Sequence, residues 1–403
     1  MSDAASPPVT MPTRRQRPLD PPQELEKWRE EAPVRRLRYA DGHLGWLVTG
    51  YAAARAVMGD SRFSTRPELH HPTTPQIGRH LAMRRPPAFF VRLDPPEHTR
   101  YRRLLTGQFT VRRMKVLEPR IAEITASTLD AMLRTGPPAE LVRDFALPIP
   151  GLVICELLGV PYADRESFRR QSATLVALDV TTEQKQQAMN ELNAYVRALV
   201  ADKRARPGDD LISGLTSGGE LTEEELAGVA MLLLVAGHET TANMLALGTF
   251  TLLGSPDQLA ALRRDPALVP GAVEELLRYL TVVDFMVRTA LEDVELDGHT
   301  IKAGETVTVS LPAANRDPLR FADPGIMDIT RDATGHLTFG HGIHQCLGQQ
   351  LARNEMRIAL PALLDRLPGL RLAVPAEEVP MRSDMLVYGV HRLPVTWPAR
   401  TSF

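Results

Sequence analysis

A long apolar run in the second half of the chain limits the folds open to it more than any other feature. Residues 229–253 are VAMLLLVAGHETTANMLALGTFTLL, and a helix needs about 20 such residues to cross a membrane. His238 and Glu239 lie in the middle of this run, however, and a charged group at that depth is costly in lipid. We therefore expect a long helix that is buried in a globular core and carries polar groups where something is bound.

The composition fits one large globular protein and excludes several other classes. The chain has 403 residues, of which 43% are hydrophobic and 24% charged, so a disordered, collagen-like or coiled-coil chain is excluded. A net charge of -2 gives no overall basic field for binding nucleic acid. The two cysteines, Cys155 and Cys346, are too few for a disulfide scaffold and favour a reducing compartment, the cytoplasm.

The two ends of the chain differ from its interior. The N-terminus is polar and rich in proline, without the apolar segment of a secretory signal, and we expect residues 1–20 to be flexible. No linker interrupts the interior, so residues 21–403 are expected to form a single domain.

Hydrophobic periodicity predicts a mainly α-helical fold with a smaller β-rich part. Helices are predicted over residues 21–32, 113–134, 141–158, 165–178, 182–205, 221–253, 256–264, 267–280 and about 346–367. Strands are predicted over residues 34–39, 45–49, 287–289, 294–296, 305–310 and, as a pair, within 385–397. Thr222 followed by Glu225 is typical of a capping box and predicts the start of the longest helix. Residues 67–87 and 313–338 are predicted to be long loops.

The segment around the second cysteine, residues 339–356, is FGHGIHQCLGQQLARNEM. Gly340, Gly342 and Gly348 surround Cys346, and glycines let a flat ligand approach the main chain closely. A helix is predicted to begin at the cysteine, and a helix N-terminus lowers the pKa of a thiol. A thiolate held in this way is a strong single axial ligand for iron.

Three other interpretations of this cysteine remain open on residue types alone. A lone buried cysteine is usually a small hydrophobic residue. His341, His344 and Cys346 could form a zinc site, although no second cluster with zinc-ligand spacing is present. The cysteine could also be a catalytic nucleophile.

The middle of the long helix contains Ala236-Gly237-His238-Glu239-Thr240-Thr241. A glycine inside a helix costs about 1 kcal/mol relative to alanine. The hydroxyl of Thr240 can bond back to the carbonyl of Ala236, which tends to bend or bulge a helix. The pattern predicts a groove lined by an alcohol and a carboxylate, and the alternative is a polar patch between two packed helices.

Together these segments resemble the cytochrome P-450 monooxygenases. Phe339, Gly342, Cys346 and Gly348 match the family's haem-ligand pattern F-x-x-G-x-x-x-C-x-G. The string from Ala236 to Thr241 resembles the oxygen-binding pattern [AG]-G-x-[DE]-T-[TS]. The resemblance extends from about residue 21 to the end, and the tail VYGVHRLPVTW is similar to soluble bacterial members of actinomycete secondary metabolism.

The resemblance implies a cytochrome P-450 fold with haem b between the long central helix and the cysteine-ligand helix. Cys346 would bind the iron, and Glu239 and Thr240 would deliver the protons that dioxygen activation needs. The implied haem-binding residues are His98, Arg102, Ala236, Arg288, Phe339, Gly340, His344 and Gly348. Four of these, His98, Arg102, Arg288 and His344, would pair with the haem propionates, because a buried carboxylate needs a partner.

Other motifs imply structural and substrate-binding roles. Glu275 and Arg278 match the family's E-x-x-R pair, with Arg331 as a third partner; Met327 replaces the aromatic residue that often precedes Asp328. Implied substrate contacts are Phe89, Leu178, Val282, Val283, Phe285 and Leu386. His70, His71, Arg84 and Arg85 could meet a polar group on the substrate.

The function implied by the resemblance is the hydroxylation or epoxidation of a small, largely apolar natural product. The sequence has no reductase domain and no nucleotide motif, so electrons from NAD(P)H would arrive through a ferredoxin and its reductase. A docking patch for an acidic ferredoxin would be formed by some of four arginines, Arg103, Arg112, Arg113 and Arg353. We expect a monomer that binds neither nucleic acid nor membrane. Ring coupling, desaturation or haem binding without turnover are the alternatives.

Overall fold

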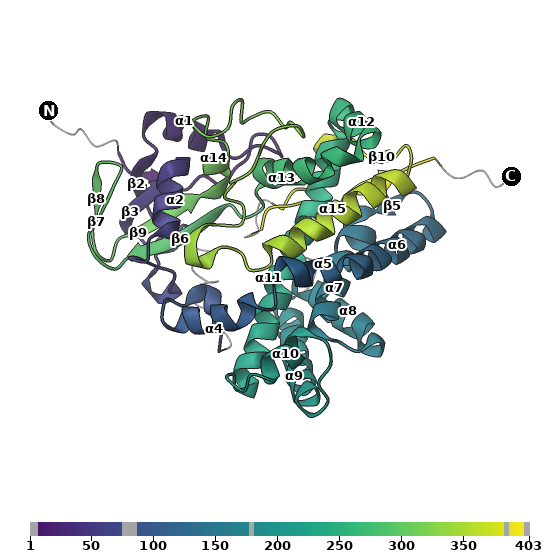
Figure 1. The fold of residues 1–403 in the computed structure, drawn as a ribbon. Coiled ribbons are helices and arrows are strands. Elements are labelled where there is room, and N and C mark those ends of the chain that lie inside the picture. The colour runs from purple at the N-terminus through teal and green to yellow at the C-terminus, as the bar shows by residue number, and fades with distance from the viewer. Residues whose placement is uncertain (1–6, 75–86, 177–180, 383–386, 399–403) are drawn as a thin grey trace.

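The computed structural model describes residues 7–74, 87–176, 181–382 and 387–398. Helices account for most of these residues, and the strands form small sheets (Figure 1). The α-helices are α1 (Gln23–Glu31), α2 (Tyr51–Gly59), α4 (Glu97–Thr106), α5 (Val111–Val116), α6 (Glu118–Thr135), α7 (Pro148–Leu158), α8 (Arg165–Val176), α9 (Thr182–Ala205), α10 (Leu211–Thr216), α11 (Glu223–Leu253), α12 (Pro256–Arg264), α13 (Val269–Leu280), α14 (Leu311–Asn315) and α15 (Gln349–Arg366).

The largest sheet joins the two halves of the chain. Its strands are β1 (Val9–Thr10), β2 (Val34–Arg38), β3 (Leu44–Val48), β9 (Thr306–Ser310), β6 (Phe285–Ala290) and β4 (Phe63–Ser64), in that spatial order. β3 pairs with β9 in parallel, and β9 pairs with β6 antiparallel. The smaller sheets contain β10 (Arg371–Leu372), β11 (Pro394–Thr396) and β5 (Ala139–Glu140), and β7 (Val294–Leu296) with β8 (His299–Ile301).

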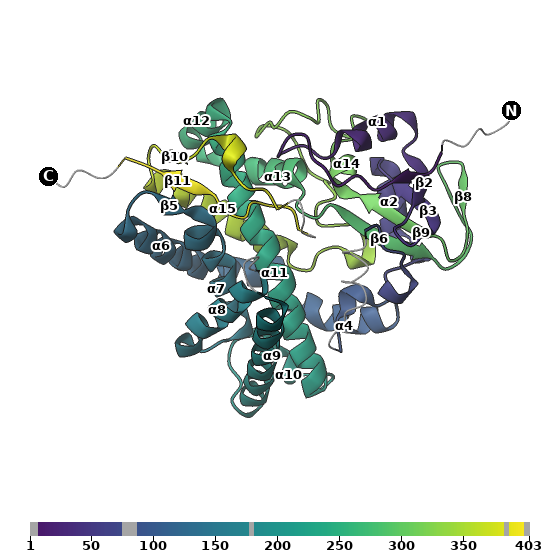
Figure 2. The same cartoon turned by 180° about the vertical axis from the view of Figure 1, so that it is seen from behind.

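The long apolar run forms α11, which crosses the helical half of the molecule (Figure 2). Thr222 and Glu225 form the predicted capping box at its start, with N–H to side-chain oxygen distances of 2.8 and 3.2 Å. The helix is long and apolar enough to cross a membrane, but 72% of its apolar window is buried inside the fold. That burial fits the predicted core helix.

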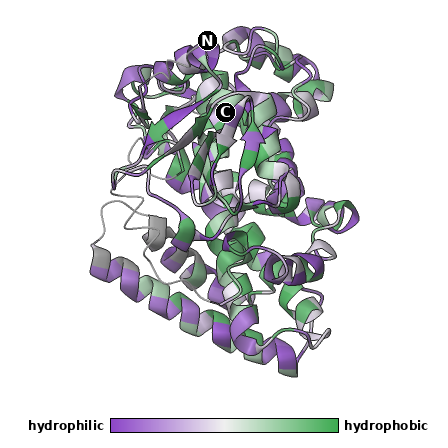
Figure 3. Cartoon of the chain, turned by 90° about the vertical axis from the view of Figure 1, so that its left-hand side faces the viewer, coloured by the Kyte–Doolittle hydropathy of each residue, from purple (hydrophilic) through white to green (hydrophobic). Residues whose placement is uncertain are grey.

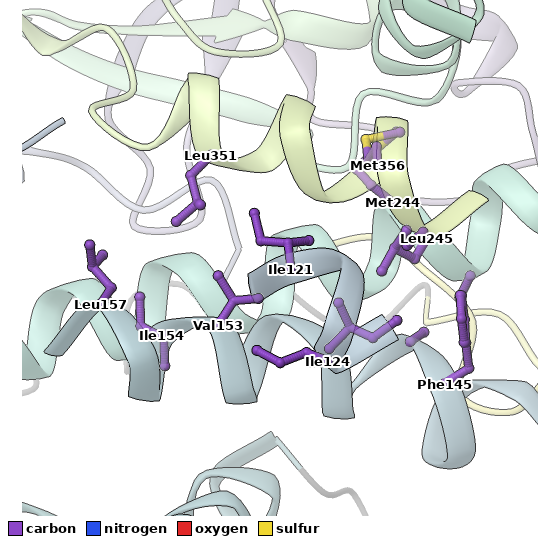
Figure 4. Packing of buried hydrophobic residues seen from close by; sticks show 14 of the residues in the cluster. Ile121, Ile124, Phe145, Val153, Ile154, Leu157, Met244, Leu245, Leu351 and Met356 are labelled. Carbon is purple, nitrogen blue, oxygen red and sulfur yellow. The ribbon is translucent and has the colours of Figure 1, made fainter. Parts of the chain in front are cut away.

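The main hydrophobic core lies where α11 meets α6, α7 and α15 (Figure 4). Ile121 and Ile124 of α6 face Val153 and Ile154 of α7, while Met244 of α11 lies beside Met356 of α15. Burying one such side chain contributes about 1.5–3 kcal/mol. Figure 3 shows the hydrophilic residues along the outer surfaces of the helices and strands, and the hydrophobic ones where elements meet.

Two helices end or begin at places that the periodicity did not predict. The predicted helix 113–134 is split at Leu117 into α5 and α6, because Pro119 opens a new helix and cannot donate to the preceding turn. The predicted helix 346–367 begins three residues later, at Gln349, so Cys346 precedes the helix and is not its first residue.

Several other boundaries also moved. The predicted helix 141–158 begins with a π-type turn, Val142–Ala146, before α7. β8 was not predicted. Among the described tail residues, β11 pairs with β10 and β5, and two single bridges join Val283 with Val387 and Met381 with Val390.

The N-terminal segment makes more contacts than its composition suggested. β1 pairs with β2, and the guanidinium of Arg15 forms an ion pair with Asp284. Arg316 binds Asp20 at 3.2 Å. Part of the segment predicted to be flexible is therefore fixed to the body of the fold.

Candidate active site

Cys346 lies in a turn immediately before α15. Its N–H donates to the Phe339 carbonyl at 2.8 Å, which closes the loop between the two residues. Cys346 is an exposed residue, yet the surrounding protein desolvates its thiol, and this desolvation raises the pKa of the thiol. The N–H of Gly348 and the guanidinium groups of Arg102 and Arg353 act in the opposite direction. The expected lowering by a helix N-terminus is therefore not the dominant effect.

The glycines of this loop serve different purposes. Gly342 has φ +75°, and a Cβ there would lie 2.5 Å from the carbonyl oxygen of Met58, at the end of α2. Gly340 also has a left-handed φ of +71°. Gly348 has an ordinary backbone, and nothing lies within 4 Å of its Cβ position. Gly342 thus fixes the loop against α2, whereas Gly348 leaves open space beside the cysteine.

α11 exposes a short strip in the middle of its otherwise buried length. Val235 is 40% exposed and Ala236 is also exposed, although the residues on both sides of them are largely buried. Figures 1 and 2 show α11 crossing α15 near the end that carries the cysteine loop. The strip gives this side of the helix room for a ligand.

The Thr240 hydroxyl donates to the Ala236 carbonyl at 2.9 Å, as predicted. The expected bulge is absent, because α11 is an uninterrupted α-helix from Glu223 to Leu253. Gly237 is not required by packing either, since a Cβ there would make only an ordinary contact with Ile154 at 3.5 Å. The hydroxyl therefore bonds within a regular helix.

Sequence reasoning missed the partner of Glu239. Its carboxylate forms a short ion pair with Arg382, which comes from the C-terminal region. The two residues are 143 positions apart, so no local pattern could have connected them. The neighbouring His238 contacts another segment, because its Nε2 lies 3.1 Å from the carbonyl oxygen of Leu147, the residue just before α7.

Four groups suited to binding carboxylates lie in one region. The rings of His98 and His344 are 4.1 Å apart, and burial lowers the pKa of both, that of His344 to about 3. Burial also lowers the pKa of Arg102, and lowers that of Arg288 to about 10. Within the described parts of the chain, neither arginine forms an ion pair with a carboxylate.

Several polar atoms in this region are buried and have no hydrogen-bond partner among the described residues. They are both ring nitrogens of His98 and Nδ1 of His344. Arg288 is only 5% exposed, and its one side-chain hydrogen bond within the described ranges goes to the adjacent Val287 carbonyl at 2.9 Å. Buried donors normally have partners, so this region fits a ligand that carries carboxylates, such as haem with its two propionates.

The E-x-x-R pair is present and fully buried. Arg278 donates to both carboxylate oxygens of Glu275 at 2.7 Å, and Arg331 donates to Glu275 at 3.2 Å. Arg278 also reaches the carbonyls of Asn315 and Pro324 at 2.9 and 3.0 Å. These bonds satisfy the buried charges and tie α13 to the loop before the cysteine.

Four of the six proposed substrate contacts lie among the described residues. Val282 is buried, and Phe89, Val283 and Phe285 are half-buried. Leu178, Leu386, Arg84 and Arg85 lie outside the described residues. Two histidines proposed to meet a polar substrate have protein partners: His70 lies 3.4 Å from the Ser64 carbonyl, and His71 lies 2.7 Å from Asp41.

Three of the four arginines of the expected docking patch form ion pairs with carboxylates of this chain. Arg112 is exposed, with no ion pair to a described residue. The other three pair with carboxylates: Arg103 with Glu220, Arg113 with Asp209, and Arg353 with Glu274.

The described residues contain no group of three His, Cys, Asp or Glu side chains that could hold a metal ion. The alternative zinc site at His341, His344 and Cys346 therefore lacks the required ligand geometry. Haem iron needs only one protein ligand, and Cys346 is available for that role. A single cysteine, an exposed strip on α11 and a group of carboxylate-binding donors fit the needs of a haem–thiolate protein.

Comparisons with known proteins agree. The family model described as cytochrome P-450 matches residues 266–387. Cytochrome P-450 105C1 of Streptomyces sp is 54% identical over 98% of this chain and 100% of that protein. Pentalenic acid synthase of Streptomyces avermitilis is 48% identical, with 98% of each protein covered. The crystal structure of CYP105P1 in complex with filipin I has a TM-score of 0.91 and 45% identity, covering 98% of this chain and 100% of that one.

The chain belongs to the cytochrome P-450 family. It is an oxidoreductase that incorporates oxygen, and the family implies haem and dioxygen. Small-molecule substrates and redox partners are also implied by membership.

Proposed function

We propose that this protein is a haem–thiolate monooxygenase that hydroxylates or epoxidises a small, largely apolar natural product in secondary metabolism. The observation that carries the proposal is that Cys346 lies near buried donors that have no carboxylate partner in the described parts of the chain. We place it in the cytoplasm as a monomer, with electrons from NAD(P)H arriving through a ferredoxin and a ferredoxin reductase.

The residues around the cysteine would hold haem b. Cys346 would bind the iron, and His98, Arg102, Arg288 and His344 would bind the propionates. Phe339, Gly340 and Gly348 would contact the haem from the cysteine loop, and Ala236 would contact it from α11. When bound, haem supplies dioxygen activation with two electrons and the oxidation of the substrate.

The chain's own task is to move protons and exclude water. Thr240 holds its hydroxyl at a fixed place, because the hydroxyl donates to Ala236 and can accept from a water molecule on its open side. Glu239 is the adjacent carboxylate and can exchange protons with solvent. The half-buried apolar side chains of Phe89, Val283 and Phe285 favour a substrate with an apolar body.

The relatives support a natural-product substrate. One is named pentalenic acid synthase and another, at 46% identity, vitamin D3 dihydroxylase. A similar solved structure holds filipin I. The presence of both Glu239 and Thr240 favours turnover over haem binding alone, and favours oxygen insertion over ring coupling or desaturation.

The proposal is tested with the purified protein expressed with ample haem precursor. We expect a coloured protein whose ferrous carbonyl complex has the absorption of a thiolate-ligated haem. Small apolar natural products are then screened for a change in the iron spin state, and hits for oxygenated products. A colourless protein, or a carbonyl spectrum like that of an imidazole-ligated globin, would refute the proposal.

A further inference from the structure

The N-terminal arm, residues 11–22, connects β1 with α1 and carries three arginines. Arg14 and Arg17 are exposed, but the side chain of Arg15, which lies between them in sequence, is only 6% exposed. Arginine side chains are rarely buried unless they are paired. The burial of this one guanidinium therefore points to a specific role inside the fold.

The Arg15 guanidinium joins two segments that are distant in sequence. It forms an ion pair with Asp284, between α13 and β6, and its Cζ lies 3.6 Å from the centre of the Tyr388 ring. A cation at this distance is attracted by the negative face of an aromatic ring. Desolvation raises the pKa of Asp284, and the contact with Arg15 opposes this rise. Arg15 thus stabilises the Asp284 carboxylate as an anion while it covers the Tyr388 ring.

Tyr388 is fixed by further contacts with the same two parts of the molecule. Its N–H donates to the Val282 carbonyl at 2.7 Å, and its hydroxyl donates to the Pro18 carbonyl of the arm, also at 2.7 Å. The preceding Val387 forms a single antiparallel bridge with Val283. The arm, the tail around Tyr388 and the segment between α13 and β6 therefore form one connected unit.

A second attachment holds the arm in place. Arg316 donates to Oδ1 of Asp20 at 3.2 Å and to the Leu19 carbonyl at 3.0 Å. The Cζ of Arg316 also lies 3.9 Å from the centre of the Tyr279 ring on α13. Contacts at both ends of the short stretch 15–20 fix the arm to the body of the fold, so Arg15 reaches its partners from a defined position.

The connected unit lies beside the proposed substrate contacts. Three of these contacts, Val282, Val283 and Phe285, belong to the segment that contains Asp284, and another lies two residues before Tyr388. A binding site needs its contact residues held within about 0.5 Å of their productive positions by supporting residues. Arg15 connects the two segments that carry these contacts, so its loss should loosen both of them.

We propose that Arg15 is a positioning residue for substrate binding: it holds Asp284 and Tyr388 together and so fixes the two apolar segments that contact the substrate. The inference rests on the proposed function, because those segments are its substrate contacts. Arg15 acts through these segments and does not touch the substrate itself. It should therefore matter more for a long apolar molecule than for a small one that binds only the iron.

The test uses two probes that bind haem iron in the haem-loaded protein: imidazole, and 1-dodecylimidazole with its long apolar tail. Arg15→Gln should weaken the binding of 1-dodecylimidazole by about fivefold, the size of one coupled contact, and that of imidazole by less than about twofold. Arg15→Lys should restore part of the loss, because it keeps the charge without the planar group that stacks on Tyr388. Spectral titration measures both dissociation constants.

The arm supplies its own matched controls. Arg14→Gln and Arg17→Gln change exposed arginines of the same arm, and neither should alter the ratio of the two dissociation constants. A double-mutant cycle tests the contact itself. In an Arg15→Gln background, Asp284→Asn should cause little further loss, because the partner of the carboxylate is already gone.

A second readout needs no bound probe. The Tyr388 amide donates to the Val282 carbonyl, and its hydrogen should exchange with solvent several times faster in Arg15→Gln, because this contact opens more often. Exchange in Arg14→Gln should match that of the unmutated protein.

Three results would overturn the inference: an unchanged ratio of the two dissociation constants in Arg15→Gln, an equal change in Arg14→Gln or Arg17→Gln, or unchanged exchange at Tyr388. If Arg15→Gln fails to fold, the same measurements on Arg15→Lys decide. The ferrous carbonyl spectrum of the unmutated protein, and its tighter binding of 1-dodecylimidazole than of imidazole, test the proposed function separately, because neither involves a change at Arg15.

Discussion

The hydroxyl of Thr240 donates its hydrogen bond to a carbonyl of its own helix, that of Ala236. Its role in the reaction can therefore be tested separately from any role in holding two elements together. Thr249 makes the same bond, to the Leu245 carbonyl at 2.8 Å, but lies two turns further along α11 and away from the exposed strip. The two threonines therefore provide a matched pair with equal local geometry.

Thr240→Ala should keep haem binding and folding stability but release several times more hydrogen peroxide per product, because the hydroxyl that orders the proton path is lost. Alanine is the better helix former, so the free energy of unfolding should change by less than about 1 kcal/mol. Peroxide and product are measured per NADH consumed. Thr249→Ala should leave this ratio unchanged, and equal ratios in both variants would contradict the role given to Thr240.

Gly342 shows how one small residue fixes the cysteine loop. Its φ of +75° and the 2.5 Å approach to the Met58 carbonyl leave no room for a side chain. Gly342→Ala should lower the free energy of unfolding by about 2 kcal/mol or more, since strain and a backbone clash add. Urea denaturation measures the change. Gly107→Ala, where nothing lies within 4 Å of the Cβ position, is the control.

At the scale of elements, one carboxylate connects α13 with α15 and the loop between them. Glu274 binds Arg353 at 2.8 Å, Arg357 at 3.0 Å and His336 at 3.2 Å. Burial alone would raise the pKa of Glu274, but the contacts with His336 and Arg353 outweigh it and lower the pKa to about 2. Arg353 also lies 4.5 Å from the ring of Phe339, so the network supports the cysteine loop.

This network should make part of the stability depend on pH. A carboxyl whose pKa is lowered on folding contributes stability above its ordinary pKa of 4.5 and loses it as the pH falls toward about 2. Glu274→Gln should therefore be less stable than the unmutated protein at pH 6, and the difference should shrink as the pH falls below 4.5. Thermal unfolding at several pH values measures this. The exposed Glu377→Gln is the control, and a pH-independent difference for Glu274→Gln would contradict the assignment.

Helices and strands could be predicted where a hydrophobic period repeats over several turns. They were harder to predict where contacts with distant parts of the chain determine the boundaries. α9, α11 and α12 lie close to the predicted ranges, because their apolar residues repeat over several turns. The break between α5 and α6 depends on a single proline, Pro119. The short strand β8 depends on its pairing with β7. Within the site, Thr240 and Ala236 are one turn apart and could be connected from sequence, whereas Arg382 meets Glu239 only in the folded chain.

At the scale of the whole molecule, charge on the cysteine side limits how a redox partner can dock. Arg103, Arg113 and Arg353 already pair with carboxylates, so their charges are partly neutralised. Arg112 of α5 is exposed, and it lies next to the exposed apolar residue Val111. We therefore expect Arg112 to contribute most of the attraction for an acidic ferredoxin.

Arg112→Glu should slow the reduction of the haem by an acidic ferredoxin at low ionic strength by about tenfold, and the difference should shrink as salt is added. Stopped-flow reduction at several salt concentrations measures both effects. Arg264→Glu, at an exposed position on α12, is the control. A salt-independent difference, or equal slowing in both variants, would contradict a docking role for Arg112.

The parallel pairing of Trp46 with Val307 has a consequence for how the protein is made. Early strands of the largest sheet stay without their central neighbour while the intervening helices are still being synthesised, because a chain emerges from the ribosome in order. Contacts so distant in sequence form slowly. If the ribosome pauses before residue 306, β9 is not yet made, and β3 lacks its parallel partner. The helices already synthesised can pack during the pause. The N-terminal strands meanwhile stay accessible to chaperones.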